Sequence, residues 1–187
     1  MTPTDSLTHI RRQNRAVNDE AWIKAFLRQA LFGVFATAHE GQPFATPKLF
    51  AYDEATHAIY FHTADQGRTS DNVRADGRVC FVASQMGRLL PAEKSSNFGV
   101  EYASVVVFGQ ARILDGVDER RYGLQLLLDK YFPRLRPGVH YPKLEAEEML
   151  GAAVYRLEIS GWSAKRKEAP DDFPGAFTFG ANPDMPA

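Results

Sequence analysis

The sequence of 187 residues has a single cysteine, so no disulfide can form within the chain, and this usage fits a reducing compartment. It has no excess of one charge sign, since 22 Lys and Arg residues stand against 23 Asp and Glu residues. Proteins dedicated to nucleic acids usually carry a basic excess, so we expect no nucleic-acid partner. No run approaches the ~18 uninterrupted apolar residues of a membrane span, and the N-terminus lacks the apolar core of a signal peptide. We therefore expect a cytoplasmic protein that does not contact a membrane.

Motifs that mark several common sites are also absent. No Gly-x-Gly-x-x-Gly run and no Walker A run occurs, which argues against Rossmann and P-loop nucleotide sites. The five histidines are scattered, so their spacing predicts no metal site. The lone Cys80 lies between apolar Val79 and Phe81, which favours a small core residue over a reactive thiol.

The composition that remains is that of an ordinary globular domain, with 44% apolar and 24% charged residues. We divide the chain into a polar, solvated N-terminal arm (residues 1–18), one folded domain (19–168) and an irregular C-terminal tail rich in proline (169–187). Hydrophobic periodicity predicts a mainly β fold with flanking helices, an α+β arrangement around an antiparallel sheet or barrel.

The predicted elements follow from apolar spacing and from turn residues. Strands are expected over residues 34–38, 44–52, 57–64, 78–84, 102–114 and 152–163. Helices are expected between Asn18, as the N-cap, and Gly33, and over residues 69–75, 117–132 and 144–150, with a loop over 89–97. Two of these strands, in residues 79–83 and 104–108, are apolar on both faces and need a second cover. That cover is either a helix of the same chain or a second subunit.

Residues 59–72 run from a strand through a glycine turn into a helix start. Helix N-termini offer unpaired N–H groups, and Arg68 adds a forked donor that suits phosphate oxygens. Near Arg68 in the sequence, Thr63, Thr69 and Ser70 add hydroxyl donors, and His62 stands at the end of the preceding strand. The segment predicts a phosphomonoester site. The simpler alternative is that Thr69 or Ser70 only caps the helix and Arg68 is a solvated charge.

Two other segments combine polar and apolar residues. Pro47 interrupts a strand and so marks an edge or a bulge. Its neighbour Lys48 shares a strand face with Phe44 and Thr46, where an amine needs an anionic or carbonyl partner unless it reaches water. Near the end of the last strand, Trp162 precedes a basic run over residues 165–167, which either faces an anionic ligand or is a solvated strand end.

Taken in order, these segments resemble the pyridoxamine 5′-phosphate oxidase-like superfamily of FMN-binding split β-barrels, and most closely its nitroimidazole-resistance-like branch. The ordered set, with its spacing, carries the resemblance over about residues 31–166. Its members are residues 43–47, 59–62, 67–68, 71–74, 78–81, 91–94, 102–111 and 161–165.

The resemblance implies a homodimer that holds FMN in a cleft between its subunits, and the second subunit then covers the doubly apolar strands. It implies that residues 46–49 lie along the isoalloxazine ring, and that residues 62–63 and 68–69 hold the phosphate and ribityl end. The implied FMN-binding residues are Thr46, Pro47, Lys48, Leu49, His62, Thr63, Arg68, Thr69, Ser104, Trp162 and Lys165.

The implied activity is that of an FMN-dependent flavoprotein oxidoreductase, similar to flavin reductases and nitroreductases, acting on a small molecule. No side chain is predicted to act as a general acid or base. Relatives often carry Arg at the position of Ala103 and an apolar or amide residue at that of Lys48, which bears on the substrate more than on flavin binding. The alternatives are a non-catalytic flavin- or haem-binding split barrel, with His62 or His140 as the axial ligand, and a dimeric barrel without a cofactor.

Overall fold

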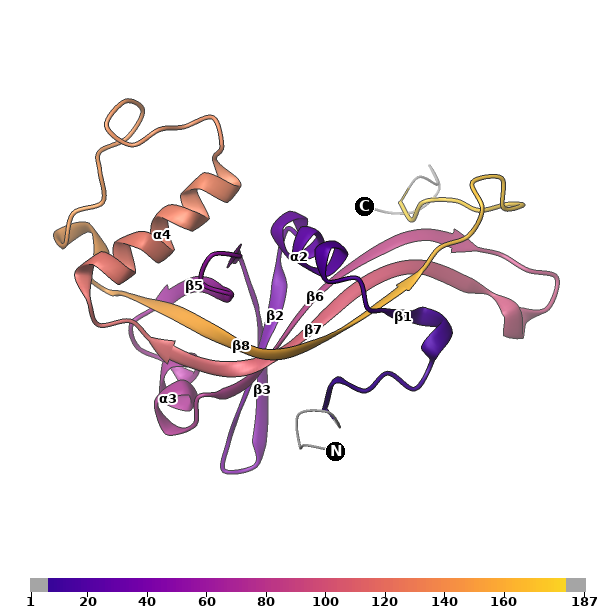
Figure 1. Cartoon of the computed structure of the whole chain (residues 1–187), viewed down its shortest axis with the longest axis horizontal. Helices are drawn as coiled ribbons and strands as arrows, with labels where there is room; N and C mark the ends of the chain where they lie inside the picture. Colours follow the sequence, from indigo (N-terminus) through magenta and orange to yellow (C-terminus); the bar gives the residue numbers. More distant parts are fainter. Residues whose placement is uncertain (1–6, 181–187) are drawn as a thin grey trace.

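The computed structural model describes residues 7–180, which build one antiparallel sheet of eight strands with flanking helices (Figure 1). The sheet follows the order β3-β2-β6-β7-β8-β5-β4, and β1 pairs with β8. The strands are β1 (Ala16–Val17), β2 (Gly33–His39), β3 (Gln42–Lys48), β4 (Ala51–Asp53), β5 (Ala58–Ala64), β6 (Arg78–Leu90), β7 (Gly99–Ile113) and β8 (Ala152–Lys167). The α-helices are α2 (Glu20–Gln29), α3 (Arg68–Ala75) and α4 (Val117–Tyr131), and 3₁₀ turns occur at η1 (Gln13–Arg15), η2 (Ser95–Asn97) and η3 (Glu147–Met149).

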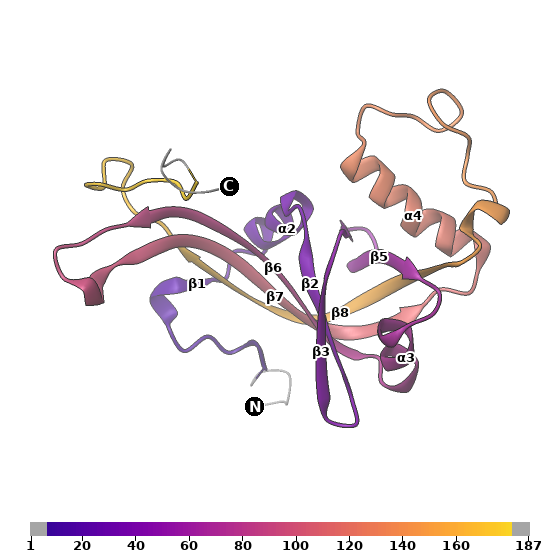
Figure 2. The same ribbon diagram turned by 180° about the vertical axis from the view of Figure 1, so that it is seen from behind.

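The sheet is strongly bent but it is not a closed barrel. Strands β3 and β4 stand at its two ends, and within residues 7–180 no ladder joins them. The expected mainly β architecture with flanking helices is therefore confirmed, whereas closure of a barrel is not seen. Strands β6, β7 and β8 are long, and their far halves leave the body as a curved arm (Figures 1 and 2).

Aromatic rings fill the concave side of the sheet. The rings of Phe35 and Tyr155 both pack on Phe61, with centroid separations of 4.6 Å in each case. Phe50 meets Phe81 edge-on at 4.7 Å, and all five rings are almost fully buried. Helix α2 covers this core with Ile23, Phe26 and Leu27. A smaller cluster lies between β5, β8 and α4, and it consists of Ala58, Tyr60, Leu114 and Val154 with partly buried Leu124 and Leu126.

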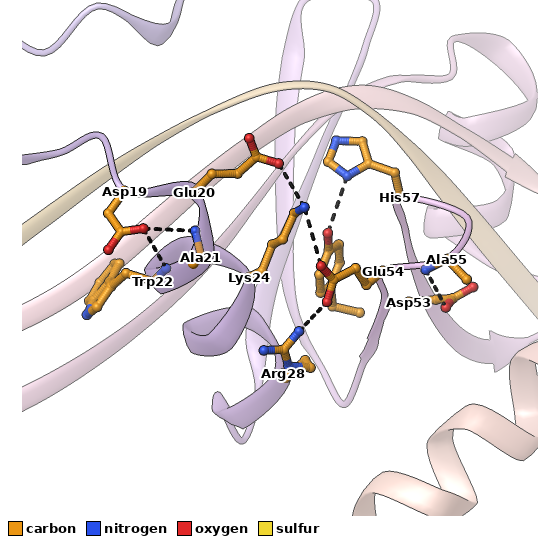
Figure 3. Close-up of polar contacts among 11 residues, drawn as sticks. Asp19, Glu20, Ala21, Trp22, Lys24, Arg28, Asp53, Glu54, Ala55 and His57 are labelled. Atoms are coloured by element: carbon orange, nitrogen blue, oxygen red, sulfur yellow. Dashed lines mark hydrogen bonds and ion pairs between the residues drawn. The ribbon is translucent and has the colours of Figure 1, made fainter.

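Helix α2 begins one residue later than expected. Asp19 is the N-cap, because its carboxylate accepts hydrogen bonds from the backbone N–H groups of Ala21 (2.9 Å) and Trp22 (3.2 Å) (Figure 3). The expected cap Asn18 is therefore wrong by one position. The same view shows Glu54, in the turn after β4, paired with Lys24 at 3.3 Å and with Arg28. These ion pairs hold α2 over the β4–β5 hairpin.

Several element boundaries also differ from expectation. The strand expected over residues 44–52 is interrupted at Leu49 and Phe50, because the Tyr131 hydroxyl binds both the N–H and the C=O of Phe50 at 3.0 Å. Strand β6 continues to Leu90, inside the predicted loop, and β8 continues to Lys167. Of the helix expected over residues 144–150 only the turn η3 forms.

The two terminal segments pack on the sheet. Strand β1, at the end of the expected solvated arm, pairs with Ala164 and Lys165 of β8. In the C-terminal tail, Arg88 of β6 donates to the carbonyls of Ala169 (3.1 Å), Pro170 (3.0 Å) and Asp171 (2.9 Å). The remaining residues of the predicted arm and tail, 1–6 and 181–187, lie outside the described residues.

Candidate functional site

The β2–β3 hairpin forms one wall of the candidate site. Its two turn residues, Glu40 (φ 50°) and Gly41 (φ 77°), both have positive φ, as a type I′ hairpin turn requires. Strand β3 is an edge strand, which agrees with the position of Pro47. Along β3 the half-buried residues Phe44, Thr46 and Lys48 alternate with exposed ones. Their partners on β2 are the buried residues Thr37, Phe35 and Gly33, so this face of β3 continues the concave side of the sheet.

Two polar groups on this face of β3, the Thr46 hydroxyl and the Lys48 amine, have no hydrogen-bond partner among residues 7–180. The Thr46 hydroxyl oxygen is buried, and no described residue hydrogen-bonds to it. Burial also lowers the pKa of the Lys48 amine. Leu49, the next residue, has 59% of its surface exposed. A buried hydroxyl without a partner costs about 1–3 kcal/mol, so this face is suited to a polar molecule that supplies the missing contact.

The N-terminus of α3 forms the neighbouring wall. Its N-cap is Gly67, whose φ of 128° and ψ of 174° suit only glycine, and no side chain caps the helix. The expectation that Thr69 or Ser70 caps α3 is wrong, since both are buried within the first turn and the Ser70 hydroxyl donates to the Gly67 carbonyl at 2.7 Å. A Cβ atom on Gly67 would meet nothing within 4 Å, so the space beside this turn is open.

Two contacts hold α3 against the hairpin. The Asn72 side-chain amide donates to the Thr37 hydroxyl at 2.8 Å, and both residues are buried. The Arg68 guanidinium lies over the ring of Phe44, 5.1 Å from its centroid. A forked cation and the first turn of a helix therefore stand beside the concave face of β3.

The end of β5 contributes one of its two predicted residues to this side. Alternate residues of β5 face different clusters, since Phe61 belongs to the main core and Tyr60 to the cluster under α4. By this alternation Thr63 faces the concave side, where its hydroxyl lies 3.2 Å from that of Tyr155. His62 is exposed and faces the α4 side, away from Arg68 and Thr69.

The remaining predicted residues lie apart from these within one chain. Trp162 faces the core, where its ring meets His57 at 4.9 Å and Tyr52 at 6.4 Å between centroids. Ser104 and Lys165 are directly paired neighbours on β7 and β8, on the convex side of the sheet. One chain thus places Thr46 and Lys48 along one face of β3, and Arg68 and Thr69 at the Phe44 end of that face. Ser104 and Lys165 lie on the opposite side of the sheet, and Trp162 packs against His57 and Tyr52.

Sequence reasoning gave no role to three residues that shape the site. Phe44 supports Arg68, Asn72 anchors α3, and Tyr131 ends β3 by binding Phe50. For Asn72 the sequence shows only an amide side chain inside a short predicted helix. The contact of Tyr131 spans 81 residues of sequence and leaves no local pattern.

A family model for pyridoxamine 5′-phosphate oxidase matches residues 19–166. The chain belongs to this family. No curated protein matches the chain.

Solved structures of the same fold agree with the family assignment. The flavocytochrome Anf3 from Azotobacter vinelandii has a TM-score of 0.75 and 25% identity, over 97% of this chain and 88% of that one. An FAD- and haem-binding protein from Mycobacterium smegmatis has a TM-score of 0.71 and 19% identity, over 84% and 76%. A putative 5-nitroimidazole antibiotic resistance protein from Bacteroides thetaiotaomicron has a TM-score of 0.65 and 16% identity, over 82% and 90%. The last two show the shared fold alone. No helix in residues 7–180 is long and apolar enough to cross a bilayer.

Proposed function

We propose that the protein is an FMN-dependent oxidoreductase that acts on a small molecule as a homodimer. The observation that carries the proposal is the buried, unpartnered hydroxyl of Thr46 on a wall that α3 and Arg68 adjoin. Membership of the pyridoxamine 5′-phosphate oxidase family and the likeness to a flavocytochrome support a flavin as the missing molecule.

The residues present fit FMN in composition and in reach. The first turn of α3 and the Arg68 guanidinium suit a phosphate dianion, because both present N–H donors and positive charge. From Phe44, beside Arg68, the concave face of β3 runs four residues to Lys48, or ~13 Å. That length lets a phosphate at one end and a flat ring system beside Thr46 and Lys48 belong to one ligand.

In this arrangement the protein binds and orients, and the flavin supplies hydride and electron transfer. Arg68 and Thr69 would hold the phosphate end, Thr63 would lie nearest the sugar-alcohol chain, and the Thr46 hydroxyl would donate to or accept from the ring edge. No described side chain has to gain or lose a proton for this role.

The observation that supports the proposed homodimer is a row of apolar residues on the convex side of the sheet. Half-buried apolar residues of three adjacent strands line up there in register: Val34 and Ala36 of β2, Val82 and Cys80 of β6, and Val106 and Phe108 of β7. Helix α2 covers the opposite side of the sheet, and on this side the N-terminal segment reaches the end of the row, where Leu7 lies beside Phe108. A mass in solution of twice 20.9 kDa supports the dimer, and a single chain mass at micromolar concentration contradicts it.

The test is the visible spectrum of the purified protein, followed by titration with FMN. We expect a yellow protein, or uptake of FMN with a dissociation constant of about 1 μM or lower, ~8 kcal/mol. Chromatography of the released flavin separates FMN from FAD. A colourless protein that takes up no flavin would refute the proposal.

The Arg68→Ala variant tests the phosphate site directly. Loss of a charge-assisted contact should weaken FMN binding about 10- to 100-fold, with little change in thermal stability. The matched control is Arg74→Ala, at the other end of α3, where the exposed side chain pairs with Asp71 at 3.7 Å. Equal FMN affinity in both variants would place the phosphate elsewhere.

A non-catalytic flavin- or haem-binding protein is the second candidate, because a flavocytochrome is among the proteins that share this fold. His62 is exposed on β5, and Nδ1 of His140 accepts the backbone N–H of Arg136 at 3.1 Å, which leaves its Nε2 for a ligand. A Soret band after addition of haem, lost in His62→Ala or His140→Ala, would favour this candidate. Turnover of a reducible small molecule by the flavin-loaded protein would favour the first.

A further inference from the structure

Lys48 ends the concave face of β3 as a cation without a partner. Within residues 7–180 its ammonium group makes no ion pair and no hydrogen bond, although the side chain is half-buried. Its cross-strand neighbour Gly33 has no side chain, and the Phe81 ring occupies that space, 2.3 Å from where a Cβ atom of residue 33 would be. The strand position beside Lys48 is therefore filled by an aromatic ring and offers its amine no polar side chain.

A second half-buried lysine, Lys130, shows how the same protein provides partners for an amine that serves only the fold. The Lys130 ammonium donates to the Ala30 carbonyl at 2.7 Å and lies over the Phe50 ring at 3.9 Å. Lys48 has neither kind of contact. Its neighbour on the same face, Thr46, also has a buried polar atom without a partner. Two adjacent inward-facing residues thus present unused polar groups to one region.

We propose that the Lys48 ammonium stabilises negative charge on the pyrimidine edge of the bound flavin ring, at N1 and the C2 oxygen, and so favours reduction. The inference rests on the proposed function. With the phosphate beside Arg68 and Phe44, the ring lies at the Lys48 end of the ~13 Å face. Oxidised flavin that accepts two electrons and one proton at N5 carries a negative charge at this edge, and a nearby cation lowers the energy of that form.

Sulfite provides an equilibrium probe of the same charge. Its sulfur lone pair forms a bond to N5 of oxidised flavin, and an electron pair of the ring moves to N1 and the C2 oxygen. No group leaves and no proton is required, so the adduct has the charge distribution that Lys48 should stabilise. Its formation bleaches the visible flavin band and is read without any turnover.

The experiment compares Lys48→Met, which keeps the length of the side chain, with Lys48→Arg, which keeps the charge. The exposed Lys94, in the connection between β6 and β7, supplies the control Lys94→Met. FMN affinity is measured first for each protein, then sulfite affinity, then the two-electron midpoint potential in a dithionite titration. We expect Lys48→Met to bind sulfite at least tenfold more weakly. If Lys48→Met also destabilises the reduced ring by a factor of ten, its two-electron midpoint potential should be lower than that of the wild type by about 30 mV. Lys48→Arg should stay within about threefold of the wild type, and Lys94→Met should be unchanged.

Unchanged sulfite affinity and potential in a Lys48→Met protein that still binds FMN would overturn the inference and leave the proposed function intact. Failure of the wild type to bind any flavin would overturn both. Should Lys48→Met lose FMN, Lys48→Gln is titrated instead, with the same tenfold loss expected and the same result overturning the inference.

Discussion

Replacement of Lys130 by methionine should make the stability of the protein respond differently to pH. The Lys130 amine lies on the last turn of α4, between the Ala30 carbonyl and the Phe50 ring. Burial lowers its pKa from the ordinary 10.5 to about 8. Methionine keeps the aliphatic stem against Phe50 and removes the ionisable group, so the two proteins differ mainly in this titration.

The pKa values of the Lys130 amine in the folded and unfolded chain give the sign and the size of the expected change in the free energy of unfolding with pH. Between about pH 8 and 10.5 the unfolded chain holds a proton on this amine that the folded chain has released, so the free energy of unfolding rises with pH. The cost of the buried charge is fully present below pH 8. At 1.36 kcal/mol per pKa unit, the full difference between 10.5 and about 8 would destabilise the folded state by ~3.4 kcal/mol below pH 8. The amine retains contact with water, and the Ala30 carbonyl and Phe50 ring favour its charged form, so we expect ~1–2 kcal/mol.

The assay is urea unfolding of both proteins at pH 7, 8, 9 and 10. Wild type should gain ~1–2 kcal/mol relative to Lys130→Met across this range. Burial raises the pKa of the Cys80 thiol and the Tyr131 hydroxyl, which lowers stability toward high pH, but both groups are present in both proteins and cancel in the difference. The exposed control Lys143→Met should track the wild type. A difference between wild type and Lys130→Met that stays constant with pH, or moves the other way, would refute the reasoning.

Two further changes test how the sheet and its tail are held. Gly109→Ala should destabilise the protein by more than ~2 kcal/mol in urea unfolding, because a Cβ atom would lie 2.0 Å from the Glu158 carbonyl oxygen; Gly116→Ala, whose nearest contact is at 3.8 Å, should change little. Arg88→Ala removes the donors that bind three tail carbonyls, so limited proteolysis should cut residues 169–180 faster while the rest of the chain stays resistant. The exposed Arg78→Ala, which loses only its pair with Asp76, should leave the cleavage rate unchanged.

Local patterns predicted the elements well wherever the fold depends on local chemistry. Strand β2, strand β5 and helix α4 lie within one or two residues of expectation, since their apolar periodicity and turn residues are continuous. The break between β3 and β4 could not be predicted in this way. It depends on the Tyr131 hydroxyl, 81 residues away, which replaces the ladder partners of Phe50.

The candidate site was predictable where chemistry follows the chain directly. Arg68 and the first turn of α3 follow a glycine turn, and Thr46 and Lys48 share a face by simple alternation along β3. The N-cap residue of α3 was not predictable from residue type, because Gly67 occupies this position through its backbone conformation and no side-chain hydroxyl caps the helix. The resulting arrangement leaves Thr69 and Ser70 free to be buried in the first turn.

For residues at the end of β8, the side of the sheet that they face was harder to predict, because an irregularity in the strand changes it. The pairing of β7 with β8 shifts between Phe108 and Gly109, so Ser160 has no partner across the ladder and its hydroxyl donates to the Phe108 carbonyl. Beyond it the alternation is reset. Trp162 therefore faces the core like Leu157, and Lys165 faces the convex side with Ser104.

That reset bears on the proposed homodimer. Ser104 and Lys165 can contribute to a flavin site only if the convex side of the sheet faces one, and within a single chain it does not. The apolar row that includes Val82, Val106 and Phe108 lies on the same side. A second copy that covers this row would therefore also lie beside Ser104 and Lys165. Two otherwise separate features, a half-buried apolar row and a divided set of predicted residues, are thus both consistent with the proposed second copy.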